Sequence, residues 1–143
     1  MEIRFIQTHS AEYDQMLILR NMVLRKPLGM DLFVEDLSRE NSDWLVGSFE
    51  DGSMTGCCIL TNEGETIRLR QMAVHPALQG KGIGRSIIEF AEDFGRQQGF
   101  KKLSMHARDS AIGFYTHCGY TILGEGFSEI GLPHHLMIKY LQK

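Results

Sequence analysis

The segment from Thr66 to Gly99 constrains the fold of this chain most, because its hydrophobic periodicity changes from that of a strand to that of a helix. Residues 66–74, TIRLRQMAV, alternate apolar and polar side chains. From about Gly82 to Gln98 the apolar residues recur on one helical face, and Gly99 ends the pattern. The stretch 78–86, LQGKGIGRS, joins the two parts. The segment therefore predicts a strand, a glycine-rich loop and an amphipathic helix in succession.

The alternation within this strand slips by one position. Ile67 and Leu69 are apolar at odd positions, whereas Met72 and Val74 are apolar at even positions. Since side-chain direction in a strand has a period of two, one extra residue is needed to keep both pairs on one face. We therefore expect a β-bulge near Arg70 to Met72, with unpaired backbone groups that bind an extended, amide-bearing ligand. A buried strand end without any ligand explains the same pattern.

The rest of the chain predicts an antiparallel meander followed by a strand–helix–strand unit. A strand at 2–7 precedes a helix that Thr8 or Ser10 caps and that stops near Pro27 and Gly29. Asp51-Gly52 joins two strands in a hairpin. Further strands are expected at 101–107, 119–125 and 136–141, with a short helix at 110–117 and a loop through 129–135. The fold class is therefore mixed α/β, close to α+β, with a single domain over residues 1–143.

Charge and hydropathy exclude several classes of partner. The net charge is -3 and no basic run is present, so we expect no nucleic-acid surface. The apolar runs are short, and the first residues, MEIRFIQ, show neither a cationic leader nor a hydrophobic stretch. We therefore expect no membrane partner and a cytoplasmic location.

The three cysteines favour reduced thiols over a disulfide framework. Cys57 and Cys58 are adjacent in a predicted strand, which suits buried thiols in a reducing compartment. Cys118 has no recognisable base beside it in the sequence, so a nucleophilic role is disfavoured.

The glycine-rich loop predicts a phosphate site of an uncommon kind. Gly82 follows Lys81, where a P-loop needs Ser or Thr, and the glycines read G-x-G-x-G, which excludes the dinucleotide fingerprint. At a helix N-terminus, successive N–H groups from about Gln79 to Gly84 form a nest for phosphate oxygens. Lys81 and Arg85 add positive charge, and no Asp or Glu occurs at 75–88. A glycine-rich turn that only packs the helix on the sheet is the alternative.

The run MAVHPALQGKGIGRSII resembles the acetyl-CoA-binding signature of the GNAT acetyltransferase superfamily, with Gln79, Gly82 and Gly84 at its core positions. The run ARDSAIGFYTHCGY at 107–120 is similar to the second motif of that family. The resemblance covers 66–122 closely and the remainder by its pattern of elements. It implies a GNAT-like fold, with a central, mostly antiparallel sheet of six to seven strands and helices on both faces.

The resemblance also implies acetyl-CoA as co-substrate. The backbone at Met72 and Val74 would hold the pantetheine arm, the N–H groups of 79–84 the pyrophosphate, and Tyr115 the sulfur. Many members carry an asparagine that contacts the cofactor at the position of Arg108, so this chain departs from the family pattern there. The expected cofactor-binding residues are Met72, Ala73, Val74, Gln79, Gly80, Lys81, Gly82, Ile83, Gly84, Arg85, Ser110 and Phe114.

Attack of an amine on a thioester asks for few catalytic side chains. The N–H of Val74 polarises the carbonyl, and Tyr115 donates a proton to the departing thiolate. A core tyrosine with its hydroxyl at the surface is the alternative for Tyr115. Glu129 is the expected base, with His106, His134 or a water chain as other candidates. We expect no metal site, because His134 and His135 are adjacent and point to opposite faces of a strand.

The acceptor is expected to be a primary amine on a small molecule or a peptide. Asp31, Glu35 and Asp36 would attract a cationic amine, or they simply form a solvated helix start. The sequence is also compatible with a homodimer. Two other functions also remain: a non-catalytic acyl-CoA-binding sensor or regulatory module, and a different nucleotide-phosphate enzyme that uses the same nest.

Overall fold

A single eight-stranded sheet forms the centre of the computed structural model, which describes residues 1–141. The strand order is β1-β2-β3-β4-β5-β8-β6, and β7 pairs with β8. All neighbouring strands run antiparallel except β4 and β5. The last two residues of the expected domain, 142–143, lie outside the described residues. The strands are β1 (Glu2–Ile6), β2 (Trp44–Glu50), β3 (Ser53–Glu63), β4 (Thr66–Val74), β5 (Lys102–Arg108), β6 (Thr121–Ile122), β7 (Phe127–Glu129) and β8 (Leu132–Tyr140).

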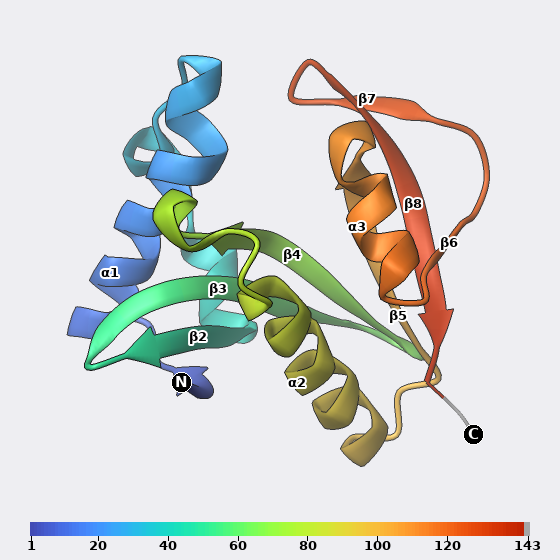
Figure 1. Ribbon diagram of the computed structural model, residues 1–143, viewed down its shortest axis with the longest axis horizontal. Coiled ribbons are helices and arrows are strands. Elements are labelled where there is room, and N and C mark those ends of the chain that lie inside the picture. The colour runs from blue at the N-terminus through green and yellow to red at the C-terminus, as the bar shows by residue number, and fades with distance from the viewer. Residues whose placement is uncertain (142–143) are drawn as a thin grey trace.

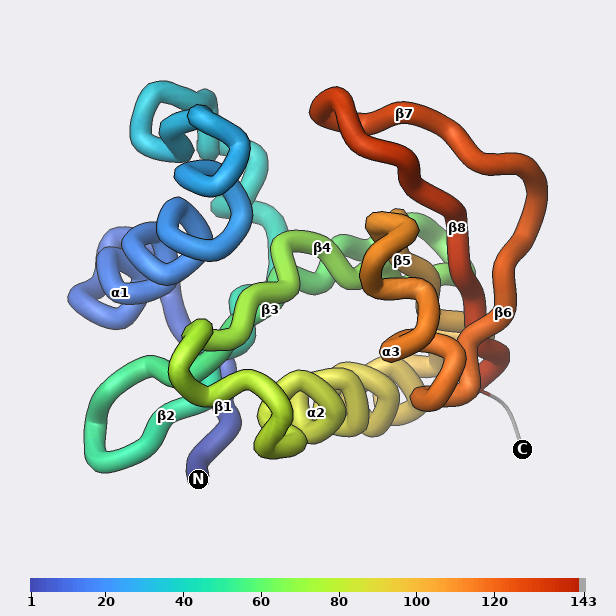
Figure 2. Tube along the Cα trace, turned by 45° about the horizontal axis from the view of Figure 1, so that its top comes forward, coloured from blue at the N-terminus to red at the C-terminus, as the bar shows by residue number. Residues whose placement is uncertain are grey.

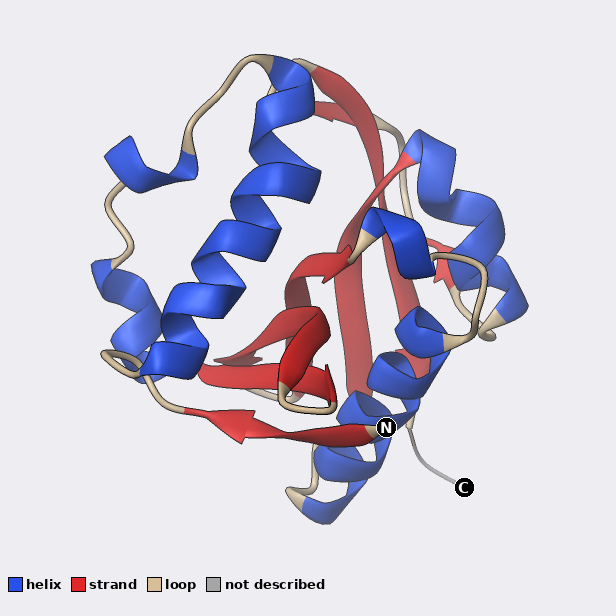
Figure 3. Ribbon diagram, turned by 60° about the vertical axis from the view of Figure 1, so that its left-hand side comes forward, coloured by secondary structure: helices blue, strands red, loops and turns tan. Residues whose placement is uncertain are grey.

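Helices cover both faces of this sheet. The helix α1 (Ala11–Arg20) packs on one face, where Met16 and Leu19 join a buried cluster with residues of β2 and β3. The helices α2 (Ile83–Gln97) and α3 (Ile112–His117) pack on the other face. Figure 3 shows the sheet between these two groups of helices. The predicted mixed fold with a mostly antiparallel sheet is therefore confirmed.

The first helix ends where its sequence predicts, although its last turns are not regular α-helix. Ser10 caps α1, because its Oγ accepts a hydrogen bond from Tyr13 N at 3.1 Å. The chain continues as the π-turn η1 (Asn21–Arg25) and the 3₁₀ turn η2 (Lys26–Leu28). Gly29 then adopts a left-handed φ of 72°, which terminates the helical run. Two more 3₁₀ turns, η3 (Leu32–Val34) and η4 (Ser38–Ser42), lead to β2.

The predicted β-bulge lies in β4. Cys57 pairs with Ala73 and Ile59 with Arg70, so Cys58 alone faces Gln71 and Met72. Gln71 absorbs the extra residue with a left-handed φ of 54°. As the bulge requires, Met72 and Val74 pack on the same cluster as Ile67 and Leu69.

The same region of β4 separates from β5. The two strands pair only from Thr66 with Lys102 to Leu69 with Met105. Beyond this point β4 bonds to β3 alone, and β5 continues along β8 as far as Arg108. Figure 1 shows β4 and β5 diverging, with α1 and β8 on opposite sides of the opening.

Two predictions near the C-terminus are wrong. The segment 119–125 contributes only the two-residue strand β6. Leu123 N still donates to the Leu136 carbonyl at 2.9 Å, and the chain then bends at Gly124, which has a φ of 82°. The loop expected through 129–135 is a β-hairpin, in which Ile130 and Gly131 take positive φ values between β7 and β8. Pro133 lies in β8, where it pairs with Ser128 of the short strand β7. His134 and His135 are therefore strand residues.

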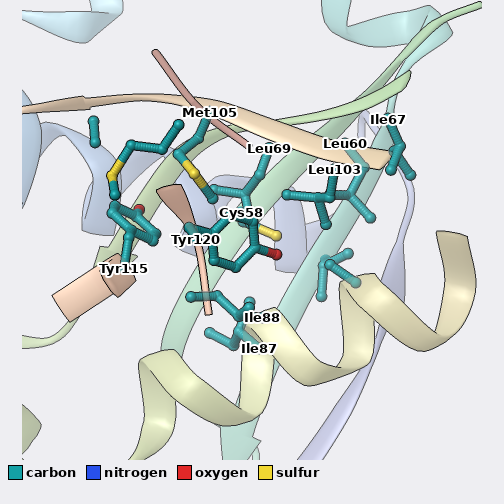
Figure 4. Packing of buried hydrophobic residues seen from close by; sticks show 14 of the residues in the cluster. Cys58, Leu60, Ile67, Leu69, Ile87, Ile88, Leu103, Met105, Tyr115 and Tyr120 are labelled. Carbon is teal, nitrogen blue, oxygen red and sulfur yellow. The ribbon is translucent and has the colours of Figure 1, made fainter. Parts of the chain in front are cut away.

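The larger buried cluster fills the space between α2, α3 and the sheet. Figure 4 shows it, with Tyr115 at one end near Met105. Cys58 lies within this cluster and Cys57 within the cluster under α1, so both thiols are buried as expected. No helix among residues 1–141 is both long and apolar enough to cross a bilayer.

Candidate active site

A cavity of about 760 Å³ opens where β4 and β5 separate. One of its walls comes from the C-terminal half of β4 and the glycine-rich loop, and the other comes from β5, α3 and β8. The π-turn η1 and the β7–β8 turn also contribute residues. Figure 2 shows these two segments, at the top of the view, on either side of the space above β4 and β5.

Nearly all of the predicted site residues line this one cavity. From the predicted cofactor site these are Met72, Ala73, Val74, Gln79, Gly80, Gly82, Ile83, Gly84, Arg85, Ser110 and Phe114. The three predicted catalytic residues, Tyr115, Val74 and Glu129, line it as well. Lys81 differs from the others, because it is exposed at the tip of the loop and does not line the cavity.

The glycine-rich loop is held open by backbone geometry. Gly80 and Gly82 have φ values of 82° and 83°, which favour glycine over any L residue. The Gln79 side chain donates a hydrogen bond to the Val74 carbonyl at 3.2 Å, which ties the loop to the end of β4. No side chain of residues 1–141 caps the start of α2 at Gly82. The first N–H groups of α2 are therefore available to an anion.

Tyr115 projects from α3 into a mostly apolar environment. The residue is 7% exposed, and its ring meets those of Phe114 and Tyr120 edge to face. Burial raises the pKa of Tyr115 far above that of an ordinary phenol, and the neighbouring thiols of Cys58 and Cys118 raise it further. The hydroxyl therefore keeps its proton at neutral and mildly alkaline pH and can donate it.

Cys118 follows α3 but is not an activated nucleophile. Burial raises the pKa of its thiol, so the protonated form dominates at neutral pH.

The three candidate bases form one cluster. Glu129 lies at its centre, with Oε1 at 2.9 Å from His106 Nδ1 and Oε2 at 3.7 Å from His134 Nε2. The ring of Phe127 stacks on His134 and meets His106 edge to face. Burial alone would raise the pKa of Glu129, but the hydrogen bond with His106 and nearby positive charges lower it below its ordinary value. Glu129 is therefore a carboxylate at neutral pH.

Hydrogen bonds determine which imidazole nitrogens can take up a proton. His134 Nδ1 lies 2.9 Å from the Leu132 carbonyl oxygen, which can only accept. In the neutral ring Nδ1 therefore carries the hydrogen, and Nε2 presents a lone pair toward Glu129.

Two possible hydrogen-bond partners lie beside the same nitrogen of His106. Its Nδ1 lies 2.9 Å from both Arg68 Nη2 and Glu129 Oε1. A guanidinium only donates and a carboxylate only accepts, so Nδ1 serves one of them at a time. Protonation of Nδ1 replaces the bond from Arg68 with a bond to Glu129.

Other predicted polar residues do not converge on the cavity. Asp31 caps η3 through Phe33 N at 3.0 Å, and Asp36 accepts from Ser38 N at 3.0 Å. Glu35 pairs with Arg25. None of these three carboxylates lines the cavity in the described part of the chain.

His134 and His135 point to opposite sides of β8, as their adjacency predicts. His134 is 3% exposed and lies in the cavity, whereas His135 Nδ1 contacts Asp109 Oδ1 at 2.7 Å.

The cavity also includes residues that the sequence pattern does not identify. These are Val23, Leu24, Arg25 and Ile130 among others, brought in by η1 and the β7–β8 turn, whereas Arg70 and Gln71, which also line the cavity, belong to the predicted bulge.

Comparison with known families identifies the origin of this arrangement. The model of the acetyltransferase (GNAT) family matches residues 8–120, which is more than half of the chain. The chain belongs to this family. The matched range of this GNAT protein contains the glycine-rich loop, α2 and α3, and it ends just before β6.

Individual relatives agree with this membership. The uncharacterized protein YyaT of Bacillus subtilis (strain 168) is 30% identical over 80 residues, which cover 56% of this chain and 54% of YyaT. This GNAT chain spans about half the length of the curated relatives it matches.

Solved structures show the same fold over the whole chain. A crystal structure of aminoglycoside 6'-N-acetyltransferase complexed with coenzyme A has a TM-score of 0.84 at 14% identity, covering 100% of this chain and 98% of that chain. The structure of Escherichia coli ElaA has a TM-score of 0.82 at 16% identity, covering 96% of this chain and 98% of ElaA.

Proposed function

We propose that this GNAT protein transfers an acetyl group from acetyl-CoA to a primary amine, by direct attack while both substrates are bound. Family membership supports acyl transfer, and the aminoglycoside acetyltransferase of the same fold binds coenzyme A. The observation that carries the proposal is the cavity that joins an uncapped helix N-terminus, a buried tyrosine and a carboxylate–imidazole cluster.

The residues on the α2 side of the cavity fit acetyl-CoA. The unpaired edge of β4 beyond Leu69 presents backbone groups to an extended pantetheine arm. The N–H groups at the start of α2 suit the pyrophosphate, and Arg85 adds positive charge. Gly84 leaves room for the ring of Phe114, since a Cβ there would approach it to 3.1 Å. When bound, acetyl-CoA supplies the activated acetyl group as a thioester.

The chain's own groups then supply orientation and proton transfer. Val74 lines the cavity, and its N–H would polarise a carbonyl placed beside β4. The Tyr115 hydroxyl would donate a proton to a departing sulfur. Both groups are pre-positioned by packing, which lowers the entropy cost of the reaction.

We further propose that the Glu129 cluster accepts the proton of the acceptor ammonium. A carboxylate with a lowered pKa is a weak base on its own, but it stabilises an imidazolium beside it. Either His106 Nδ1 or His134 Nε2 can take the proton and then pair with Glu129.

Glu129→Gln removes the stabilisation of the imidazolium by Glu129 while keeping the size of the side chain. We expect kcat to fall on the order of 10²-fold, with acetyl-CoA affinity unchanged. Unchanged kcat would exclude the cluster from proton transfer.

A thermal-shift comparison of acetyl-CoA, ATP and NAD tests the proposed co-substrate. A ligand at about a hundred times its dissociation constant stabilises a fold by roughly 2.7 kcal/mol, which is several degrees for a chain of this size. We expect this shift with acetyl-CoA alone. A shift with ATP or NAD but not with acetyl-CoA would overturn the proposal and favour another nucleotide-phosphate enzyme.

Turnover separates an enzyme from an acyl-CoA-binding sensor. Release of free thiol from acetyl-CoA is followed with and without a mixture of primary amines. We expect amine-dependent thiol release and formation of the acetylated amine. Binding of acetyl-CoA without any transfer would identify the sensor instead.

A further inference from the structure

The end of the cavity away from the glycine-rich loop is unusually rich in arginine. Arg25 from η1, Arg70 from β4 and Arg108 from β5 line this end of the site. Val23, Leu24 and Ile130 add apolar surface. Among the described residues that line the cavity, Glu129 is the one acid, and its carboxylate is already engaged with imidazoles.

Arg108 stands apart from the other arginines. Its Nη2 donates to the Leu24 carbonyl at 3.3 Å, and no carboxylate in residues 1–141 forms an ion pair with it. Arg25, by contrast, holds Glu35 with two hydrogen bonds of 2.7 and 3.3 Å. Burial lowers the pKa of Arg108 and the nearby charge of Arg25 lowers it further, while the carboxylate of Glu129 raises it in part.

The Arg108 side chain contacts η1 and lies within electrostatic range of Glu129, where the proposed mechanism has the amine lose its proton. Arg108 is the last residue of β5, and its hydrogen bond reaches across the opening to η1. A guanidinium presents five donors in a planar fork, of which one is used here. The remaining donors match the two oxygens of a carboxylate.

Gln71 supplies a second unused group in the same part of the cavity. The bulge gives it a left-handed backbone, and its Oε1 is buried without a hydrogen-bond partner among the described residues. A buried acceptor of this kind is costly unless a ligand donates to it. An ammonium or amine N–H is such a donor.

We propose that the acceptor amine also carries a carboxylate, which Arg108 binds while Gln71 and the Glu129 cluster receive the amine. This inference rests on the proposed acetyl transfer. The acceptors are therefore amino acids or related amino carboxylates, in preference to polyamines or other purely cationic amines. An amino phosphonate offers an oxyanion as well, but its greater charge requires more positive charge than Arg108 supplies, and Arg108 is the cavity guanidinium without an ion pair among residues 1–141.

Matched acceptor pairs test the proposal on the unaltered protein. Each amino acid is compared with its own carboxamide, for example phenylalanine with phenylalaninamide and 6-aminohexanoate with 6-aminohexanamide. These pairs keep the carbon skeleton and replace the carboxylate with a neutral amide. In the 6-aminohexanoate pair the amine is remote from that group, so its pKa stays nearly the same and the charge is the main difference. We expect kcat/KM to be about tenfold or more higher for the carboxylate in at least one skeleton, the size typical of a charge-assisted pair.

Variants then assign the preference to Arg108. Arg108→Gln is expected to lower kcat/KM for the carboxylate by about tenfold or more and to change it less than twofold for the amide. Arg108→Lys keeps the positive charge without the planar pair of donors, so its kcat/KM for the carboxylate should lie between those of Arg108→Gln and the unaltered protein. Lys26→Gln removes an exposed cation that neighbours Arg25 but does not line the cavity, so it should retain the full preference.

The possible results separate this inference from the proposed function. Equal use of carboxylates and amides, a preference for the phosphonate, or transfer to polyamines alone would overturn the inference. Loss of acetyl-CoA affinity in Arg108→Gln would do the same, because it would assign Arg108 to the cofactor. Acetyl-CoA binding without transfer to any member of the panel also counts against it. Failure of acetyl-CoA to bind would instead overturn the proposed function.

Discussion

Removal of the Tyr115 hydroxyl oxygen tests the proposed proton transfer. Tyr115→Phe keeps the ring that packs against Phe114 and Tyr120 and removes the proton donor. General acid catalysis typically contributes on the order of 10² to 10⁴ in rate, so we expect kcat to fall by that factor. Acetyl-CoA affinity should change far less, because the donor acts in the transition state. An equal loss of affinity and rate would make Tyr115 a binding residue.

The pH dependence of this effect follows from the burial of Tyr115. Its pKa is raised above that of a free phenol, so the protonated, donating form is present below that value and is lost only as the pH rises through it. The ratio of kcat for wild type to kcat for Tyr115→Phe should therefore be the same at neutral pH and at about pH 9.5, still below an ordinary phenol pKa of about 10. A ratio that shrinks between these two values would show that the phenol ionises in this range.

Among the elements, the two ends of α2 allow the effect of backbone strain to be distinguished from the effect of ligand contact. Gly82 precedes α2 and Gly99 follows it, with φ values of 83° and 84°, and a Cβ added at either position would meet no atom within 4 Å. Substitution of either by Ala should cost roughly 1–2 kcal/mol of stability, because an L residue is strained at such angles. Gly82→Ala should also weaken acetyl-CoA binding, since its Cβ occupies the approach to the helix N-terminus.

Gly99→Ala is the matched control, because it carries the same strain at the far end of the same helix and does not line the cavity. Urea unfolding measures the stability of both variants, and calorimetric titration measures their affinity for acetyl-CoA. Equal affinities in the two variants would mean that the glycines serve the fold alone.

At the scale of the whole molecule, local signals predicted the α2 half of the site better than the acceptor half. The slip in TIRLRQMAV and the spacing of LQGKGIGRS are contiguous in sequence, so periodicity and turn chemistry were enough to locate the bulge, the loop and α2. The acceptor half combines η1, β5 and the β7–β8 hairpin, which come together only through the topology of the sheet. The meeting of His106 with Glu129 and the unpaired state of Arg108 among residues 1–141 depend on that topology.

The divergence of β4 and β5 also bears on how the open edge of β4 is shielded from strands of other molecules. A strand edge with unpaired N–H and C=O groups normally recruits further strands from other molecules and starts aggregation. In this molecule the open edge of β4 beyond Leu69 faces inward, toward the cavity, with η1 on one side of the opening and α3 on the other. Extended backbone from a neighbouring molecule would have to enter past both elements to pair with it. The chain can therefore keep a reactive strand edge available to a narrow ligand while denying it to another sheet.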